Sequence, residues 1–453
     1  MSDQKIVISE SKKYIVFIGL ALISIGIGLF FHQTMDTENG LLAGYWEMVQ
    51  APGIIDYDSF AHAKNHGSPY VNSGLMLLAT LLIFKITKTT IQGVHIAAAM
   101  QVVGFAFYGK DLSNIWFTII GVFAHTAYMK KPLSSASHIA IFSTALSPIF
   151  STTFFGEAGI GSGSLQAFIL AAVLGILAGV LVSILAGHLP ALHNGYTLFN
   201  VGLAAGFVGM LVYSLKMRLD IVHTARDNVI YFEHLHYTTG ENLPLGITLF
   251  IMFLYLIIMG FAFGGGKEIK NMIWHKAKGG NFVEKFGFAP SLINMGIMGI
   301  ISTVYVFITG GHLNGALFAC IWTALGFAAN GVSVRMYLPT MLGVAIAAFF
   351  TGGIQGAVAS GDFLTGALSR VGSRGMLLAA IFSCGMAAVV GAHGALAGIL
   401  VGFVHAILVP STAQFHGWMS LYNNGFSLSI VVILLYPIYS KMGLPKEQPP
   451  AAK

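Results

Sequence analysis

Residues 192–213 read LHNGYTLFNVGLAAGFVGMLVY, and residues 415–436 read FHGWMSLYNNGFSLSIVVILLY. Aligned without gaps, the two stretches share the pairs His193 and His416, Leu198 and Leu421, Asn200 and Asn423, Gly202 and Gly425, and Tyr213 and Tyr436. Polar side chains are costly in apolar surroundings, so shared His and Asn residues carry more weight than shared Leu or Val. The two stretches therefore predict an internal duplication of the chain.

Weaker similarity extends upstream of both stretches. Residues 177–182 (LAGVLV) match residues 396–401 (LAGILV), and GKDL at 109–112 lies opposite GGHL at 310–313. Duplicated halves around a pseudo-two-fold axis are typical of transporters and channels, in which the solute binds at the repeat interface near the middle of the membrane. Loop charges favour parallel repeats, whereas a break at Gly391–Gly394 is compatible with inverted ones, and both arrangements stay open.

The composition identifies the class of protein. Of 453 residues, 56% are hydrophobic and 9% are charged, against roughly 25% charged in a soluble domain. The 55 glycines suit helices that pack closely inside a bilayer. The net charge of +6 is modest and predicts no nucleic-acid partner, and Cys320 and Cys384 show no disulfide or metal spacing. We expect an all-α, polytopic bundle of membrane helices with an internal duplication, surrounded by the lipid bilayer.

Apolar runs recur along the whole chain. They lie near residues 14–31, 70–86, 93–108, 112–130, 137–155, 166–187, 195–214, 245–264, 289–309, 314–331, 335–352, 376–392, 394–409 and 419–440. A helix needs about 20 apolar residues to cross the hydrocarbon core, and several of these runs are shorter. We therefore expect about 12–14 transmembrane segments, with some re-entrant half-helices among them.

Charges in the loops predict the orientation. Lysines cluster before the first run, after the second and fourth runs, and in the loop between the eighth and ninth, whereas the loop after the first run is acidic. Because positive loops stay in the cytoplasm, the N-terminus is predicted to be cytoplasmic. The expected order is a cytoplasmic tail (1–13), a first transmembrane repeat (14–215), an external loop (216–244), a second repeat (245–440) and a cytoplasmic tail (441–453).

The duplicated polar residues are the first candidates for a substrate-binding site. These candidates are His193, Asn200, His416 and Asn423. Pro190 and Pro410 are expected to prevent continuous helix just before them. A helix N-terminus at membrane depth offers unpaired N–H groups and a positive dipole to a polar solute, and Asn offers both donors and an acceptor. The alternative is that both segments are interfacial loops with capping Asn residues.

A second candidate lies at Thr309–Gly315 (TGGHLNG), between two apolar runs. Locally it resembles the half-helix element of aquaporins, in which Gly-rich residues, His, Leu and Asn precede Pro-Ala, although Gly315 stands in place of that Pro. A broken helix would bring Asn314, with His312 beside it, to a cavity. A tight external turn is the favoured alternative.

Other chemistry has little support in the sequence. No HExxH, GxSxG, P-loop or dinucleotide fingerprint occurs, so no ATP-driven or hydrolytic mechanism, metal or cofactor is predicted. Asp111 and Glu157 are the acidic residues closest to apolar runs, and the His-rich 218–237 segment is a weak candidate for a metal site. Further His residues leave coupling to protons open, and Na⁺ is the alternative coupling ion.

The segments 46–57 (WEMVQAPGIIDY) and 67–74 (GSPYVNSG), together with the two His/Asn repeats, carry a family resemblance. Over nearly its whole length the chain resembles a bacterial family of multi-pass membrane proteins known as domain of unknown function fifteen seventy-six. That resemblance implies the bacterial inner membrane and brings no reaction or site residues. A distant resemblance to urea transporters rests on LFNVGLAAG at 198–206 and LYNNGFSLS at 421–429, without that family's Leu-Pro-x-x-Thr-x-Pro-Phe signature.

These observations favour a transporter or channel-like permease. A small polar solute would pass, without ATP, between two homologous halves lined by the candidate His and Asn residues, and a homo-oligomer is compatible with this hypothesis. The alternatives are a membrane-embedded enzyme acting on a lipid-linked substrate, which needs an acid/base cluster at one membrane face, and a non-catalytic subunit of a membrane complex.

Overall fold

The computed structural model of the chain describes residues 7–34, 39–156, 161–221, 239–275, 279–419 and 423–441. Within these ranges the secondary structure is helical, without a β-strand, and one isolated bridge joins Ile54 to Met419. Among the described residues, ten helices are long and apolar enough to cross a membrane, and three shorter apolar helices accompany them. The predicted polytopic bundle of membrane helices is therefore confirmed. Glu157 and most of the 218–237 segment lie outside the described residues.

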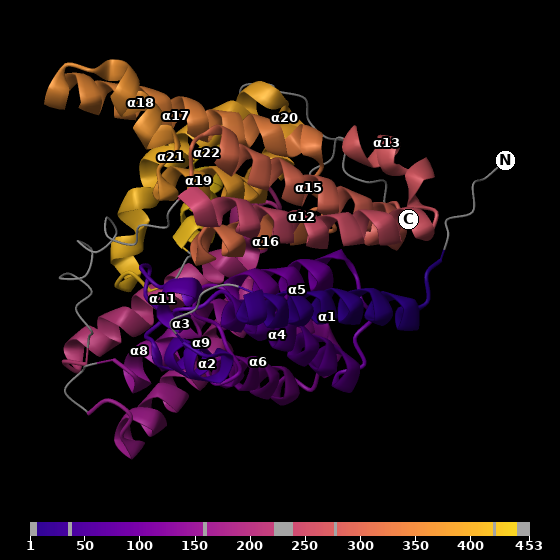
Figure 1. Cartoon of the computed structure of the whole chain (residues 1–453), viewed down its shortest axis with the longest axis vertical. Helices are drawn as coiled ribbons and strands as arrows, with labels where there is room; N and C mark the ends of the chain where they lie inside the picture. Colours follow the sequence, from indigo (N-terminus) through magenta and orange to yellow (C-terminus); the bar gives the residue numbers. More distant parts are fainter. Residues whose placement is uncertain are drawn as a thin grey trace.

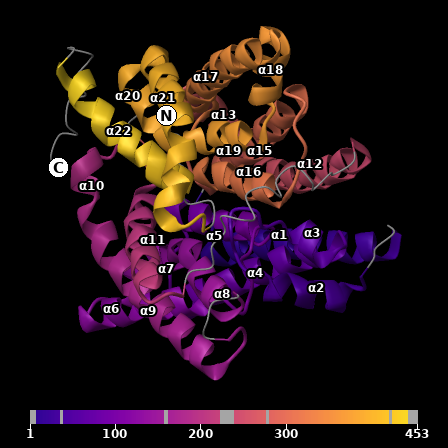
Figure 2. The same ribbon diagram turned by 90° about the vertical axis from the view of Figure 1, so that its left-hand side faces the viewer.

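The long elements follow the same order in both halves of the chain. The first half contains α1 (Glu10–Thr34), α4 (Gly67–Ile86), α5 (Gly93–Phe105), α6 (Trp116–Tyr128), α7 (Ser137–Ser143), α8 (Pro148–Phe154), α9 (Leu165–His188) and α11 (Asn200–Arg218). The second half contains α12 (Thr239–Ala262), α15 (Phe288–Ile308), α16 (Gly315–Phe327), α17 (Val334–Ser360), α19 (Arg374–Phe382), α20 (Ala387–His393), α21 (Ala395–Thr412) and α22 (Asn423–Lys441). In Figures 1 and 2 the two halves form two groups of helices that lie side by side.

Short elements join the long helices. They are α2 (Leu41–Gln50), α3 (Ser59–Ala63), α10 (Pro190–His193), α13 (Ile269–Ile273), α14 (Phe282–Lys285), α18 (Phe363–Val371) and the 3₁₀ turns at Leu133–Ala136, Thr144–Leu146, Gly265–Lys267, Ser383–Met386 and Ala413–His416. A helix follows each polar segment as expected, since α11 begins at Asn200 and α22 is described from Asn423 onward. The expectation that Pro410 breaks the helix is wrong, because α21 continues through it to Thr412. Proline at this point, in the last turn, removes one hydrogen bond and does not end the helix.

Equivalent side chains make equivalent contacts in the two halves, which supports the duplication. Asn72 in α4 donates to the carbonyls of Ala106 and Lys110, and Asn294 in α15 donates to those of Ala328 and Val332. Asn72, Ala106 and Lys110 each precede their counterparts Asn294, Ala328 and Val332 by 222 positions in the sequence. Helices α5 and α16 also match, because both have 13 residues.

Two upstream alignments expected from the sequence are wrong in register. The turn at 109–112 corresponds to 331–334 rather than to 310–313. Asn72 donates to the Lys110 carbonyl in the first turn, and Asn294 donates to the Val332 carbonyl in the second. The alignment of residues 177–182 with 396–401 is wrong by one helical turn. Gly179 packs against the Thr118 carbonyl, and Gly402 packs in the same way against the Thr340 carbonyl, so Gly179 corresponds to Gly402. Apolar letters alone do not fix the register of a helix, whereas a buried amide or a close Gly contact does.

The two repeats are inverted. Helix α12 runs antiparallel to its counterpart α1, because Tyr255, near the end of α12, donates to the Val16 carbonyl near the start of α1. Helix α15 then begins beside the start of α1, where the Phe17 and Phe288 rings lie 5.9 Å apart. Helices α5 and α16 are also antiparallel. Gly104, near the end of α5, packs against Ala319 near the start of α16, and Gly326, near the end of α16, packs against Ala97 near the start of α5. The pseudo-two-fold axis therefore lies across the helices rather than along them.

Helix directions define two faces of the bundle. We call the face where α1 begins and where α4, α6 and α12 end the lysine-rich face, after Lys12, Lys85, Lys130 and Lys267. The opposite face, where α1 and α15 end, is called the far face. The Thr309–Gly315 segment lies there as a turn between α15 and α16, which agrees with the favoured alternative.

The outer surface of the bundle is apolar. Large side chains such as Leu22, Leu165 and Ile258 are more than half exposed on helices that otherwise pack inward. Exposed apolar surface of this extent is typical of helices that face lipid. Polar residues such as Asn72 and Asn294 are instead fully buried between helices, where their hydrogen bonds are satisfied internally.

Candidate functional site: a cavity between the two repeats

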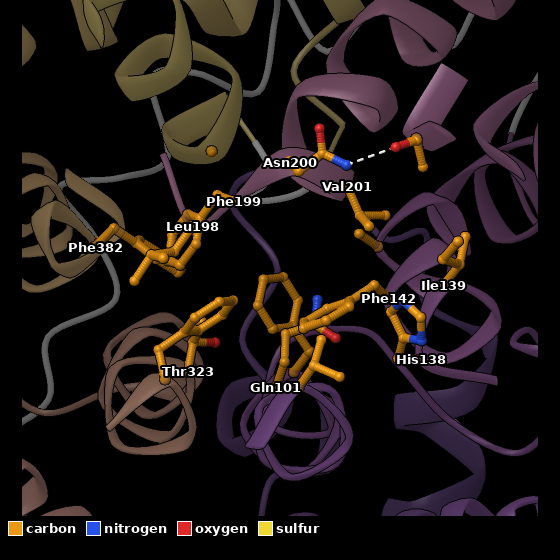
Figure 3. A pocket seen from close by; sticks show the side chains of 17 residues that line it. Gln101, His138, Ile139, Phe142, Leu198, Phe199, Asn200, Val201, Thr323 and Phe382 are labelled. Atoms are coloured by element: carbon orange, nitrogen blue, oxygen red, sulfur yellow. Dashed lines mark hydrogen bonds between the residues drawn. The ribbon is translucent and has the colours of Figure 1, made fainter. Parts of the chain in front are cut away.

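A cavity of about 200 Å³ lies between the repeats. Helices α5, α7 and α9 and the start of α11 line it from the first repeat, and α16, α19 and α22 line it from the second. Figure 3 shows the Gln101 and Thr323 side chains on one side of this space and Phe199 and Asn200 on the other. The cavity is mostly apolar and contains a few polar groups, which is typical of small-molecule sites.

The lining residues occur as symmetry-related pairs. Gln101 and Thr323 occupy equivalent positions on α5 and α16, and the further pairs are Phe105 and Phe327, Phe142 and Phe382, and Gly202 and Gly425. The last pair lies on the axis, because a Cβ added to either glycine would lie 3.2 Å from the other's Cα. The cavity therefore surrounds the pseudo-two-fold axis, the place where duplicated transporters bind their solutes.

Access to the cavity is not symmetric. Val94, His138 and Asn200 extend it toward the lysine-rich face, and all three are partly exposed. Their counterparts in the second repeat are Ala316, Leu378 and Asn423, which are buried and do not line it. The lining of the cavity thus includes partly exposed residues toward the lysine-rich face, whereas their counterparts toward the far face are buried outside it.

A polypeptide segment closes the far face. Residues 53–58, here called the strap, join the repeats, because the Gly53 amide donates to Ser151 and the Ile55 amide to the Trp418 carbonyl. The Asp58 carboxylate accepts from the Gly315 amide at 2.9 Å and so caps α16. An anion at a helix N-terminus satisfies free N–H groups and interacts favourably with the helix dipole.

The lysine-rich face has an equivalent cap of lower charge. Asn281 accepts from the Gly93 amide at 2.9 Å and so caps α5, and its own amide donates to Gln92. The neighbouring Phe282 amide donates to the Ala329 carbonyl, as the Ser59 amide does to Phe107 on the far face. Each of the helices α5 and α16 is thus capped by the segment that lies between the first two long helices of the opposite repeat.

Of the predicted site residues, Asn200 lines the cavity. Its amide points away from the interior in Figure 3, because Nδ2 donates to the Ala186 carbonyl at 2.8 Å. His193 is buried in α10, and its Nε2 lies 3.0 Å from Asn200 Oδ1. These contacts join the ends of α9, α10 and α11, so the pair holds one wall of the cavity in place.

The other predicted residues lie near the far face. His416 and Asn423 are buried at the end of α21 and the start of α22. Asn314 caps α16 by accepting from the Leu317 amide, and His312 is exposed in the preceding turn. Inversion of the repeats separates the two His/Asn pairs, so the structure does not bring the six candidates into one site. Their role in binding stays a prediction.

Sequence reasoning missed Gln101, Thr323 and the phenylalanine pairs. A signal was present, because QVVGF at 101–105 and TALGF at 323–327 share Gly-Phe at the 222-residue offset. The match AIFS at 140–143 and 380–383 is stronger and includes Phe142 and Phe382. The AIFS match was hidden because the second repeat has more residues between α16 and α19 than the first has between α5 and α7, which changes the offset.

The family model for proteins of unknown function, DUF1576, matches residues 37–217 and 267–441, one region in each half. The chain belongs to the DUF1576 family. Among curated proteins and solved structures nothing matches the chain. The two matched regions fit the duplication seen in the fold, and the likeness to urea transporters stays a prediction.

Proposed function

We propose that this DUF1576 protein is a membrane transporter that moves a small polar solute between its two repeats by alternating access, without ATP. The supporting observation is the cavity on the pseudo-two-fold axis, which extends toward one face. Inverted repeats can exchange their conformations, and the exchange would open the same cavity to the opposite face. The lysines of the lysine-rich face support placing this face in the cytoplasm, and under this proposal the described state faces inward.

The exchange predicts which buried residues become accessible. Leu378 on α19 is the counterpart of His138. His138 lines the cavity, whereas Leu378 is buried and only 6% exposed. In an outward-facing state Leu378 would take the position that His138 has now. A single cysteine at Leu378, in a variant without Cys320 and Cys384, should therefore react with a membrane-impermeant maleimide added outside intact cells.

The neighbouring Ala380→Cys is the matched control, because Ala380 is fully buried in a separate cluster with Val344 and Ala347. We expect Leu378→Cys to label at least fivefold faster than this control, and His138→Cys to label from the cytoplasmic side. If Leu378→Cys stays unreactive while His138→Cys reacts, the cavity opens to one face alone, which contradicts transport and favours a one-sided binding site or enzyme.

A further inference from the structure

Lys110 is a buried cation beside the cavity. It follows α5 in the turn at Gly109, its side chain is 1% exposed, and its backbone is held by Asn72. Its Nζ donates to Gln101 Oε1 at 3.0 Å and lies 4.4 Å from the centre of the Phe105 ring. Gln101 and Phe105 both line the cavity, so the ammonium group stands directly behind its wall.

The charge of Lys110 has no anionic partner in the described part of the chain. No described carboxylate lies within 4.0 Å of Nζ, and the adjacent Asp111 carboxylate accepts from Ser113 and Asn114 instead. An ammonium group has three donors, and in the described part of the chain the Lys110 group contacts one neutral acceptor, Gln101 Oε1, and one aromatic ring, that of Phe105. Burying a charge without a counter-charge is expensive, and in membrane proteins such residues commonly mark a substrate or ion pathway.

The second repeat shows that the turn itself does not need a lysine. Val332 occupies the equivalent position, and its carbonyl accepts from Asn294 as the Lys110 carbonyl accepts from Asn72. The contact that shapes the turn is made by the backbone in both repeats. The ammonium group therefore breaks the internal symmetry at one point, and it does so next to the cavity.

The remaining lining residues indicate the body of the ligand. Four phenylalanines, paired as Phe105 with Phe327 and Phe142 with Phe382, surround the space near Gln101 and Thr323. Aromatic walls favour a flat or apolar body, and a cavity of about 200 Å³ admits a molecule of roughly one ring. Because Gln101 Oε1 is held by Lys110, its amide nitrogen is the end of that side chain left to donate to a solute oxygen.

We propose that the solute is a small organic anion, with an apolar or aromatic body between the phenylalanine pairs and an anionic oxygen at Gln101, compensated by the Lys110 ammonium group. This inference rests on the proposed function, whose solute it specifies. Lys110 provides the counter-charge through Gln101, so it acts as a positioning and charge-balancing residue. Its removal should erase the preference for an anion and leave binding of a neutral analogue.

Three aromatic probes of similar size separate charge from shape: benzoate, benzamide and benzylammonium. Binding of each to the purified full-length protein in detergent is measured by thermal stabilisation and by displacement of radiolabelled benzoate. We expect benzoate to bind at least tenfold tighter than benzamide, and benzylammonium to bind most weakly. Lys110→Met should bring benzoate and benzamide within about twofold of each other, while Gln101→Leu should weaken both.

Lys216→Met is the matched control. Lys216 is 3% exposed, and its Nζ donates to Thr152 Oγ1 at 3.1 Å, near the end of α11 and away from the cavity lining. It should leave the preference for benzoate unchanged. Should Lys110→Met not elute as a folded species, Lys110→Gln tests the same loss of charge, and Lys110→Arg should retain the preference.

Two results overturn the anion site. One is equal binding of benzoate and benzamide by the wild-type protein, and the other is a tenfold preference that survives in the neutral Lys110 variants. Either result combined with labelling of Leu378→Cys from outside removes the anion site and leaves the transport proposal standing. A preference for benzoate that depends on Lys110, combined with unreactive Leu378→Cys, would keep the anion site and remove the transport proposal.

Discussion

Single buried polar residues decide how the half-helices end and begin. Asn72 and Asn294 each bind two carbonyls beyond the C-terminus of α5 or α16, while Asp58 and Asn281 bind the first amides of α16 and α5. A backbone group left unpaired inside a membrane protein costs free energy, so one amide or carboxylate at each end permits a 13-residue helix to end inside the bundle. These residues fix the central helices around the cavity.

Asp56 in the strap is expected to make stability depend on pH. No group in the described part of the chain donates a hydrogen bond to its carboxylate oxygens, and Asp56 lies outside the spanning helices. Burial raises its pKa to about 6, an effect that the nearby Arg374 partly offsets. Because the pKa of Asp56 is higher in the folded state than in the unfolded state, folding favours the neutral carboxyl. The contribution of Asp56 to the free energy of unfolding is therefore lost as pH rises from about 4 to about 6.

We therefore expect Asp56→Asn to raise the thermal unfolding midpoint at pH 7.5, by about 1–3 °C because solvent partly screens this incompletely buried group. At pH 4 the variant and the wild type should unfold together. Glu47→Gln is the control, since Glu47 is exposed on α2, and it should change the midpoint at neither pH. A stabilisation that is equal at both pH values would contradict the assignment.

At the scale of the element, close glycine contacts set the distance between helices. A Cβ on Gly104 of α5 would lie 2.7 Å from the Trp322 Cβ and 2.9 Å from the Ala319 backbone, and Gly326 of α16 meets Met100 and Ala97 in the same way. Small residues allow close approach of helices where no hydrophobic effect drives association. The antiparallel α5–α16 pair is thus the rigid centre of the molecule.

Gly104→Ala and Gly326→Ala should each destabilise the protein by about 1–3 kcal/mol, because the backbone of the partner helix must move. Gly26→Ala in α1 and Gly187→Ala in α9 are matched controls, since nothing lies within 4 Å of the added methyl group. These should stabilise by about 0.5–1 kcal/mol through the better helix propensity of Ala. Thermal unfolding in detergent gives the comparison, and equal effects at all four positions would refute the packing argument.

At the scale of the whole molecule, the inverted repeats give one chain two related conformations. The strap contacts residues of both repeats on the far face, where Ile54 bridges to Met419 and the Ile55 carbonyl accepts from Tyr108 and Arg374. Opening toward that face requires these contacts to separate. The strap is therefore the place at which the described conformation can be locked.

The double variant Ile54→Cys, Met419→Cys should form a disulfide on oxidation, because bridged residues have Cα atoms about 4.5–5.5 Å apart, a distance that suits a disulfide. The bond should reduce labelling of Leu378→Cys from outside at least fivefold, and reduction should restore it. Each single cysteine is the control and should leave Leu378→Cys labelling unchanged under oxidation. Unchanged labelling in the cross-linked protein would show that the strap does not close the far face.

The sequence by itself determined the membrane bundle and its duplication. An apolar fraction of 56% leaves no polar surface for a soluble fold, and His193 and His416 recur with Asn200 and Asn423 at fixed spacing. Composition and residue spacing are properties of the linear sequence, so they can be recognised without the tertiary structure. A helix after each of the two polar segments was predictable for the same reason.

Only the tertiary structure decided the direction of the repeats and the place of the cavity. Inversion sends the two His/Asn pairs to opposite faces, and it brings Gln101 to Thr323 instead. Helix direction depends on how many segments cross between equivalent positions, and short helices such as α5, α6 and α16 make that number ambiguous in sequence. The isolated charge of Lys110 likewise acquires meaning only from its burial beside that cavity.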